Sequence, residues 1–193
     1  MGRLDGRAFA ATLLVVAALG LAGCGLAGAP VDDPGLVADG LPAGPDAVIA
    51  RVVDGDTIVV GDGQTIRLIG VDTPETKHPS KPVQCFGREA SRQTTALLPR
   101  GTRVRLVYDV ERTDRYGRTL AYVVRVRDGL LVNAALLRDG FGQPLTIPPN
   151  VAHAEEFADL ARQARQAGRG LWGACTEAGA APAPGAWHGL GAA

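Results

Sequence analysis

Residues 54–75 carry the side chains of this chain that are best suited to chemistry. The carboxylates of this stretch include those of Asp56, Asp72 and Glu75, and the guanidinium group of Arg67 lies among them in the sequence. Carboxylate and carbonyl oxygens are the ligands that Ca²⁺ prefers in proteins. An arginine beside such an ion neutralises and orients a phosphodiester through paired hydrogen bonds. The combination therefore predicts a metal-assisted hydrolase of phosphodiesters.

A second arginine, Arg118, lies later in the chain within the sequence Arg-Tyr-Gly-Arg. Each short motif also has an ordinary structural explanation. Residues 54–56 read Asp-Gly-Asp, which is typical of a hairpin turn, and residues 72–74 read Asp-Thr-Pro, which is typical of a turn before proline. Arg118 alone is typical of an exposed strand residue. Only their joint occurrence favours a functional site over these structural explanations.

The fold must bring these separate motifs together. Alternating apolar residues predict strands, and apolar residues at helical spacing predict helices. The expected strands are 48–53, 57–60, 65–71, 102–108 and 120–126, and the expected helices are 87–98, 132–139 and 154–167. Short strands with an inserted helix, followed by two more helices, indicate an α+β fold. We expect a five-stranded Greek-key β-barrel of the OB type with three helices.

The N-terminal residues 1–23 have the pattern of an export signal. Arg3 and Arg7 precede an apolar stretch, 8–19, that is too short to span a membrane comfortably. The sequence Leu-Ala-Gly-Cys that follows resembles the bacterial lipoprotein signal, in which Cys24 is lipidated and becomes the first mature residue. An ordinary signal peptide with an incidental cysteine is the alternative. We expect an exported protein that is lipid-anchored at the outer face of the bacterial cell membrane.

The rest of the chain divides by composition. Residues 24–45 are rich in glycine and proline and predict a flexible tether, and residues 46–175 predict one folded domain. Residues 176–193 are rich in alanine, glycine and proline and predict a disordered tail. The formal net charge of the whole chain is +0, which argues against nucleic-acid binding through bulk charge. A local excess of basic residues in 77–127 still allows a basic face.

Cys85 and Cys175 remain as an even pair once Cys24 is assigned to lipid. Disulfides persist in exported proteins, so the pair predicts a bridge between the start of one helix and the end of another. Two free buried thiols are the alternative. Neither cysteine lies near another cysteine or a histidine at the spacing of metal ligands, and the three histidines are scattered. A zinc site is therefore not indicated.

Taken together, the motifs resemble the staphylococcal nuclease (thermonuclease) family. The resemblance covers residues 48–172 and rests on short motifs that share one order and spacing. The motifs that follow the family pattern are residues 53–57, 67–68, 71–79, 87–91, 112–118 and 120–122. The resemblance implies an OB-fold barrel with three helices. It also implies a Ca²⁺-dependent endonuclease that cleaves DNA and RNA and leaves 3′-phosphates.

The resemblance assigns metal-binding roles to the first group of residues. Asp56 and Asp72 would bind Ca²⁺ directly, and Thr73 would add its backbone carbonyl. Asp54 would lie just outside the direct ligands and orient them.

The remaining residues would act on the substrate. Arg67 and Arg118 would hold the scissile phosphate, Glu75 would be the general base, and Tyr116 would lie near the phosphate of the nucleotide. One departure from the family stands out. The family prototype carries base-stacking tyrosines after its second helix, whereas residues 143–150 here contain no aromatic side chain.

Two other functions stay open. Nuclease-like barrels also serve as non-catalytic adaptors that bind nucleic acid or protein, and such adaptors typically lose the acidic ligands or the arginines. This chain keeps both. A surface lipoprotein with a purely structural Ca²⁺ would leave Arg67 and Arg118 without a purpose. We expect a monomer that acts on DNA and RNA, with the membrane as its other partner and no protein partner.

Overall fold

The computed structural model describes residues 41–76 and 82–175. The expected signal segment, Cys24 and the expected tail at 176–193 lie outside these residues. The first strand, β1 (Ala43–Val52), begins within the segment expected to be a tether. Ala43 pairs with Val107 at the end of β5 (Arg103–Val107). Strand pairing therefore starts earlier than the composition indicated. No helix within the two described ranges is long and apolar enough to cross a membrane.

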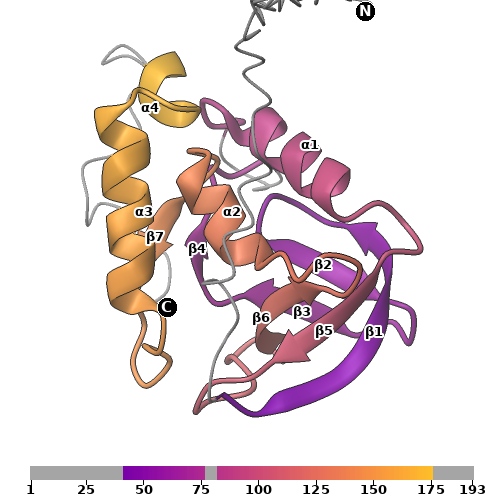
Figure 1. Ribbon diagram of the computed structural model, residues 1–193. Coiled ribbons are helices and arrows are strands. Elements are labelled where there is room, and N and C mark those ends of the chain that lie inside the picture. The colour runs from indigo at the N-terminus through magenta and orange to yellow at the C-terminus, as the bar shows by residue number, and fades with distance from the viewer. Residues whose placement is uncertain (1–40, 77–81, 176–193) are drawn as a thin grey trace, which may run out of the picture. The chain divides into compact units, whose positions relative to one another are not determined.

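Five strands close into a barrel in the order β1-β2-β3-β6-β5 (Figure 1). The other three are β2 (Thr57–Val60), β3 (Thr65–Leu68) and β6 (Thr119–Arg125). Neighbouring strands are antiparallel except for β3 and β6, which are parallel. The predicted α+β fold with a five-stranded OB-type barrel is thereby confirmed. The parallel pair matters for function because it places Arg67 opposite Leu120, close to the second arginine motif.

The strand expected over residues 65–71 is in fact two strands. β3 ends at Leu68, and β4 (Gly70–Asp72) leaves the barrel to pair with β7 (Gln143–Leu145). Gly70 has a φ of 78°, and a Cβ there would lie 2.5 Å from the ring of Phe157. Only glycine combines this backbone conformation with such a close approach. The break carries Asp72 out of the barrel while Arg67 stays within it.

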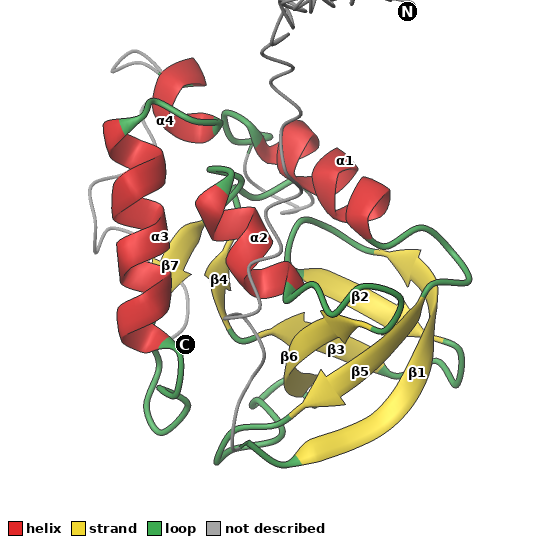
Figure 2. Ribbon diagram, in the orientation of Figure 1, coloured by secondary structure: helices red, strands yellow, loops and turns green. Residues whose placement is uncertain are grey.

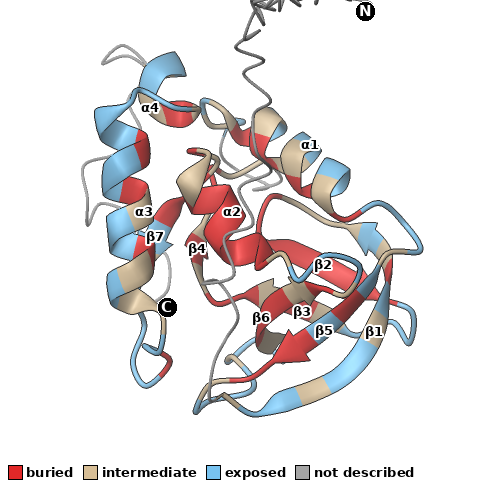
Figure 3. Ribbon diagram, viewed as in Figure 1, coloured by how far each residue is buried: buried red, intermediate tan, exposed pale blue. Residues whose placement is uncertain are grey.

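Helices cover one side of the barrel (Figure 2). They are α1 (Gly87–Leu97), α2 (Val132–Arg138), α3 (Ala154–Gln166) and the single turn α4 (Leu171–Ala174). The three expected helices are all present. α2 is buried along most of its length and lies between the barrel and α3 (Figure 3). Its Asn133 side chain donates to the carbonyl of Ile69 at 2.8 Å and accepts from the N–H of Val123 at 2.9 Å. The first bond ties α2 to the β3–β4 break, and the second ties it to β6.

Cys85 and Cys175 form a disulfide with a Cα–Cα distance of 6.0 Å. The predicted bridge is therefore confirmed. It joins the residue two positions before α1 to the residue just after α4. The backbone N–H of Leu171 in α4 also donates to the carbonyl of Gly140, at the end of α2, at 2.9 Å. The bridge thus anchors the start of α1 to the C-terminal helices.

Candidate active site

The turn between β1 and β2 carries the first two acidic residues. Oδ1 of Asp54 accepts a hydrogen bond from the N–H of Asp56 at 3.2 Å. Between them, a Cβ on Gly55 would lie 2.5 Å from Oγ1 of Thr73, so a larger residue would push the turn away from that threonine. The carbonyl of Gly55 accepts from the buried hydroxyl of Thr94 on α1 at 2.6 Å. Helix α1 therefore holds this turn in place.

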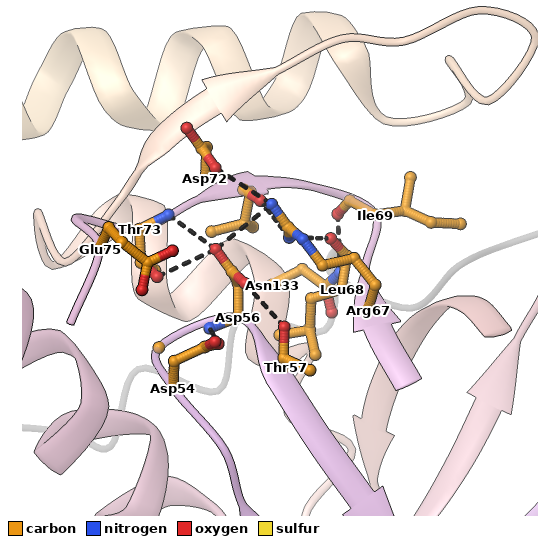
Figure 4. Close-up of polar contacts among 12 residues, drawn as sticks. Asp54, Asp56, Thr57, Arg67, Leu68, Ile69, Asp72, Thr73, Glu75 and Asn133 are labelled. Atoms are coloured by element: carbon orange, nitrogen blue, oxygen red, sulfur yellow. Dashed lines mark hydrogen bonds and ion pairs between the residues drawn. The ribbon is translucent and has the colours of Figure 1, made fainter. Parts of the chain in front are cut away.

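The carboxylate of Asp56 connects the turn to the segment that follows β4. Asp56 is only 6% exposed. Its Oδ2 accepts hydrogen bonds from the backbone N–H of Thr73 at 2.8 Å and from the Thr73 hydroxyl at 2.9 Å. Its Oδ1 accepts from the hydroxyl of Thr57 at 3.1 Å (Figure 4). Two segments far apart in sequence are joined by this one carboxylate.

The guanidinium group of Arg67 lies between two carboxylates. Nη2 lies 3.3 Å from Oδ2 of Asp56 and 3.1 Å from Oδ1 of Asp72. Nη1 donates to the carbonyl of Leu68 at 2.9 Å and to that of Val71 at 2.6 Å. The backbone break that moves Asp72 out of the barrel therefore also fixes the arginine that reaches it. The three ionic side chains form one charged cluster (Figure 4).

Glu75 lies in an irregular segment just beyond this cluster. Its backbone N–H donates to Oε1 of Gln84 at 2.8 Å, and its carbonyl accepts from the N–H of Gln84 at 2.9 Å. Its own Oε1 accepts from the N–H of Thr76 at 2.7 Å. In Figure 4 the side chain extends toward Thr73 and Asp56. Within residues 41–76 and 82–175, no three His, Cys, Asp or Glu side chains gather closely enough to hold a metal ion by themselves.

The second arginine sits in a tight turn organised by Asp114. Oδ1 of Asp114 accepts from the N–H groups of Tyr116 and Arg118, both at 2.9 Å, and Oδ2 accepts from Nε of Arg118 at 2.7 Å. Burial raises the pKa of Asp114, but the hydrogen bonds and charge of Arg118 outweigh it, so the net shift of this pKa is downward. The guanidinium of Arg118 lies 5.3 Å from the centre of the Tyr116 ring, and that of Arg115 lies 4.9 Å from it.

The strand register relates the two arginines. Arg67 pairs with Leu120 across the parallel β3–β6 pair. Thr119 pairs with Ile66 in the same register, so Arg118, one position before Thr119, lies beside the start of β3. The ion-pair partner of Arg118 in this arrangement is Asp114.

Comparison with known proteins agrees with this geometry. Residues 65–174 match the family described as "Staphylococcal nuclease homologue". This chain belongs to that family. It is 42% identical over 127 residues to a thermonuclease of Staphylococcus hyicus, a match that covers 64% of this chain and 73% of the relative. It is 39% identical over 132 residues to a thermonuclease of Staphylococcus intermedius, a match that covers 67% of this chain and 77% of the relative. It is 36% identical over 132 residues to Endonuclease YncB of Bacillus subtilis, a match that covers 66% of this chain and 61% of that protein. The family resemblance of the sequence is thereby confirmed, and the similarity supports a nuclease function.

The residues of this staphylococcal nuclease homologue fit a calcium ion by donor type. Asp56, Asp72 and the backbone of Thr73 supply oxygen only, which is the ligand class that Ca²⁺ prefers. The two carboxylates already share one cationic group, the Nη2 atom of Arg67. Burial, together with the smaller effect of the charge of Asp56, raises the pKa of Asp54 to about 6.

Sequence reasoning did not single out three polar side chains that position this nuclease-family site. Thr94 fixes Gly55, Gln84 fixes the backbone of Glu75, and Asn133 fixes the break between β3 and β4. A signal exists only for Thr94, which is a polar residue on the otherwise apolar stripe of its helix. Gln84 lies in a segment without periodicity, so no pattern marks it.

Proposed function

We propose that this protein is a Ca²⁺-dependent endonuclease that hydrolyses DNA and RNA to products with 3′-phosphates. The observation that carries the proposal is the cluster in which Arg67 lies between the carboxylates of Asp56 and Asp72. The register of β3 against β6 places Arg118 beside the start of β3, because Thr119 pairs with Ile66. The similarity of this chain to two thermonucleases and an endonuclease also supports the hydrolysis of nucleic acid.

A phosphodiester is an anion, so the site must offset its charge before water can attack the phosphorus. Asp56, Asp72 and the carbonyl of Thr73 would hold the calcium ion. When bound, the ion would act as a Lewis acid toward a phosphate oxygen. The guanidinium groups of Arg67 and Arg118 would donate hydrogen bonds to the other phosphate oxygens, with Arg67 exchanging its contacts with Asp56 and Asp72 as these carboxylates turn to the ion. These bonds strengthen as negative charge builds up in the transition state.

The side chain of Glu75 takes the proton of the attacking water as general base. Its position two residues after Thr73 keeps it beside the proposed metal ligands. Asp54 orients the turn that presents Asp56 through the bond from the Asp56 N–H. The exposed ring of Tyr116 packs against Arg118, so it lies next to a phosphate held by that arginine.

Removal of calcium is expected to abolish hydrolysis. Protein freed of metal with EGTA should not cleave single-stranded DNA or RNA, and addition of Ca²⁺ should restore cleavage. Affinity should be weak, with a Kd on the order of 10⁻⁴–10⁻³ M, as is common for extracellular calcium sites. Calorimetry with Ca²⁺ alone gives a readout that does not depend on activity, and Asp72→Asn should weaken this binding. Undiminished hydrolysis in excess EGTA would contradict the proposal.

We also propose that the protein is exported and anchored through lipid on Cys24. The support is the apolar stretch 8–19 followed by Leu-Ala-Gly-Cys. Cys24→Ser should move the protein from the membrane fraction to the soluble fraction, because it removes the residue that would carry the lipid. Two or more acyl chains give stable anchoring, whereas one gives only marginal binding. The measurement is fractionation of cells that express the full chain. Retention of Cys24→Ser on washed membranes would instead indicate an uncleaved apolar segment as the anchor.

A further inference from the structure

Gln84 satisfies both backbone polar groups of Glu75. Its side-chain Oε1 accepts from the N–H of Glu75 at 2.8 Å, and its backbone N–H donates to the carbonyl of Glu75 at 2.9 Å. Glu75 lies outside the helices and strands of the described chain, so no regular ladder fixes its backbone. These two bonds set the position of its Cα, from which the carboxylate extends toward Asp56.

Gln84 is itself held firmly. The next residue, Cys85, is tied covalently to Cys175 beyond α4. The carbonyl of Gln84 accepts from the N–H of Gly87 at 3.1 Å, at the start of α1. Gly87 also packs closely on the Glu75 segment, since a Cβ there would lie 3.1 Å from the carbonyl oxygen of Glu75. The position of Gln84 is therefore set by a disulfide and a helix start.

We propose that Gln84 is a positioning residue for Glu75 in phosphodiester hydrolysis. This inference rests on the proposed function, in which Glu75 is the general base. A general base must lie within hydrogen-bond reach of the proton that it removes. A misplacement of about 1 Å can cost as much as a hundredfold in rate. The amide of Gln84 gives Glu75 that placement, and the disulfide and α1 provide the rigid support.

The test replaces the amide with a side chain of similar size whose thioether is only a weak hydrogen-bond acceptor. Gln84→Met should lower kcat on single-stranded DNA about tenfold, within the range that general-base placement controls. KM and the Kd for Ca²⁺ alone should change by less than about twofold, because neither arginine nor the proposed metal ligands are touched. Gln84→Glu, which keeps an acceptor oxygen, should retain more activity than Gln84→Met. Gln166→Met at the exposed end of α3 is the matched control and should match the wild type.

A double-mutant cycle separates positioning from general stabilisation. In the Glu75→Gln background, Gln84→Met should cause no further loss of kcat, since no general base is left to position. An equal loss in both backgrounds, or a wild-type kcat for Gln84→Met, would overturn the inference while leaving the nuclease function intact. Full activity of Glu75→Gln would overturn the role of Glu75 and the inference with it. If Gln84→Met does not fold, as judged by thermal melting, Gln84→Asn is used instead. It keeps the amide on a shorter side chain, and the same loss of kcat is expected.

Discussion

Arg118→Ala is expected to lower the rate of DNA hydrolysis by about a hundredfold or more, by analogy with the loss of one donor to a developing oxyanion. The fold should persist. The side chain of Arg118 is 32% exposed and its ion pair is with Asp114 in the same turn, so its removal should cost less than about 1 kcal/mol of folding free energy. Arg118→Lys should not restore the rate, because a lysine ammonium cannot form a paired hydrogen bond with a phosphate.

The measurement is steady-state kinetics on single-stranded DNA at saturating Ca²⁺, together with thermal melting. Arg162→Ala is the matched control, since it removes an exposed arginine paired with an acid three positions away, Asp159, on α3. This control should keep wild-type activity. Arg67→Ala is a less clean test, because Arg67 also satisfies two backbone carbonyls of the β3–β4 break and its loss should destabilise the fold. Near-normal turnover by Arg118→Lys would exclude a paired contact with the phosphate.

Loss of the Cys85–Cys175 bridge is expected to produce the largest change in stability. The two cysteines are 90 positions apart in sequence. For a loop of this length the chain-entropy model gives a stabilisation of up to about 4–5 kcal/mol, which strain usually reduces. If Cys175→Ser lowers the free energy of unfolding by about 3 kcal/mol, the Tm should fall by roughly 10 °C for a domain of this size.

Thermal unfolding with and without a thiol reductant measures this effect. Reduction should lower the Tm of the wild type toward that of Cys175→Ser, and the reductant should leave that variant unchanged. Mass spectrometry of a non-reduced digest should find the Cys85–Cys175 peptide pair in protein isolated from cells that express the full chain. Two thiols that react with an alkylating reagent in the native protein would show that the bridge does not form there.

Local patterns were sufficient to predict the five barrel strands and the three longer helices, whereas the barrel itself was inferred from their order and from the family resemblance. Alternating apolar residues mark one face of a strand, and helical spacing marks one face of a helix, so these elements can be read within a few consecutive positions. The types of residue needed for phosphate chemistry could also be read directly. Asp56 lies in the turn just before β2, Asp72 is the last residue of β4, and Arg67 lies within β3. Their types and order are properties of the sequence alone.

The tertiary structure decided how these residues meet. The period of two in residues 65–71 continues through Gly70, so the pattern could not reveal that β4 leaves the barrel there. The placement of Arg67 between two carboxylates depends on that break. Likewise, Ala43 belongs to a strand only because Val107 lies opposite it.

The supporting contacts were the least predictable part of the site. Thr94 bonds to Gly55, 39 positions away in sequence, and Gln84 bonds to Glu75, 9 positions away. A polar side chain finds its hydrogen-bond partner through the packing of whole elements, and periodicity describes only the face on which a residue lies. The sequence therefore determined which groups could perform the reaction, whereas the folded chain alone determined which groups hold them in position.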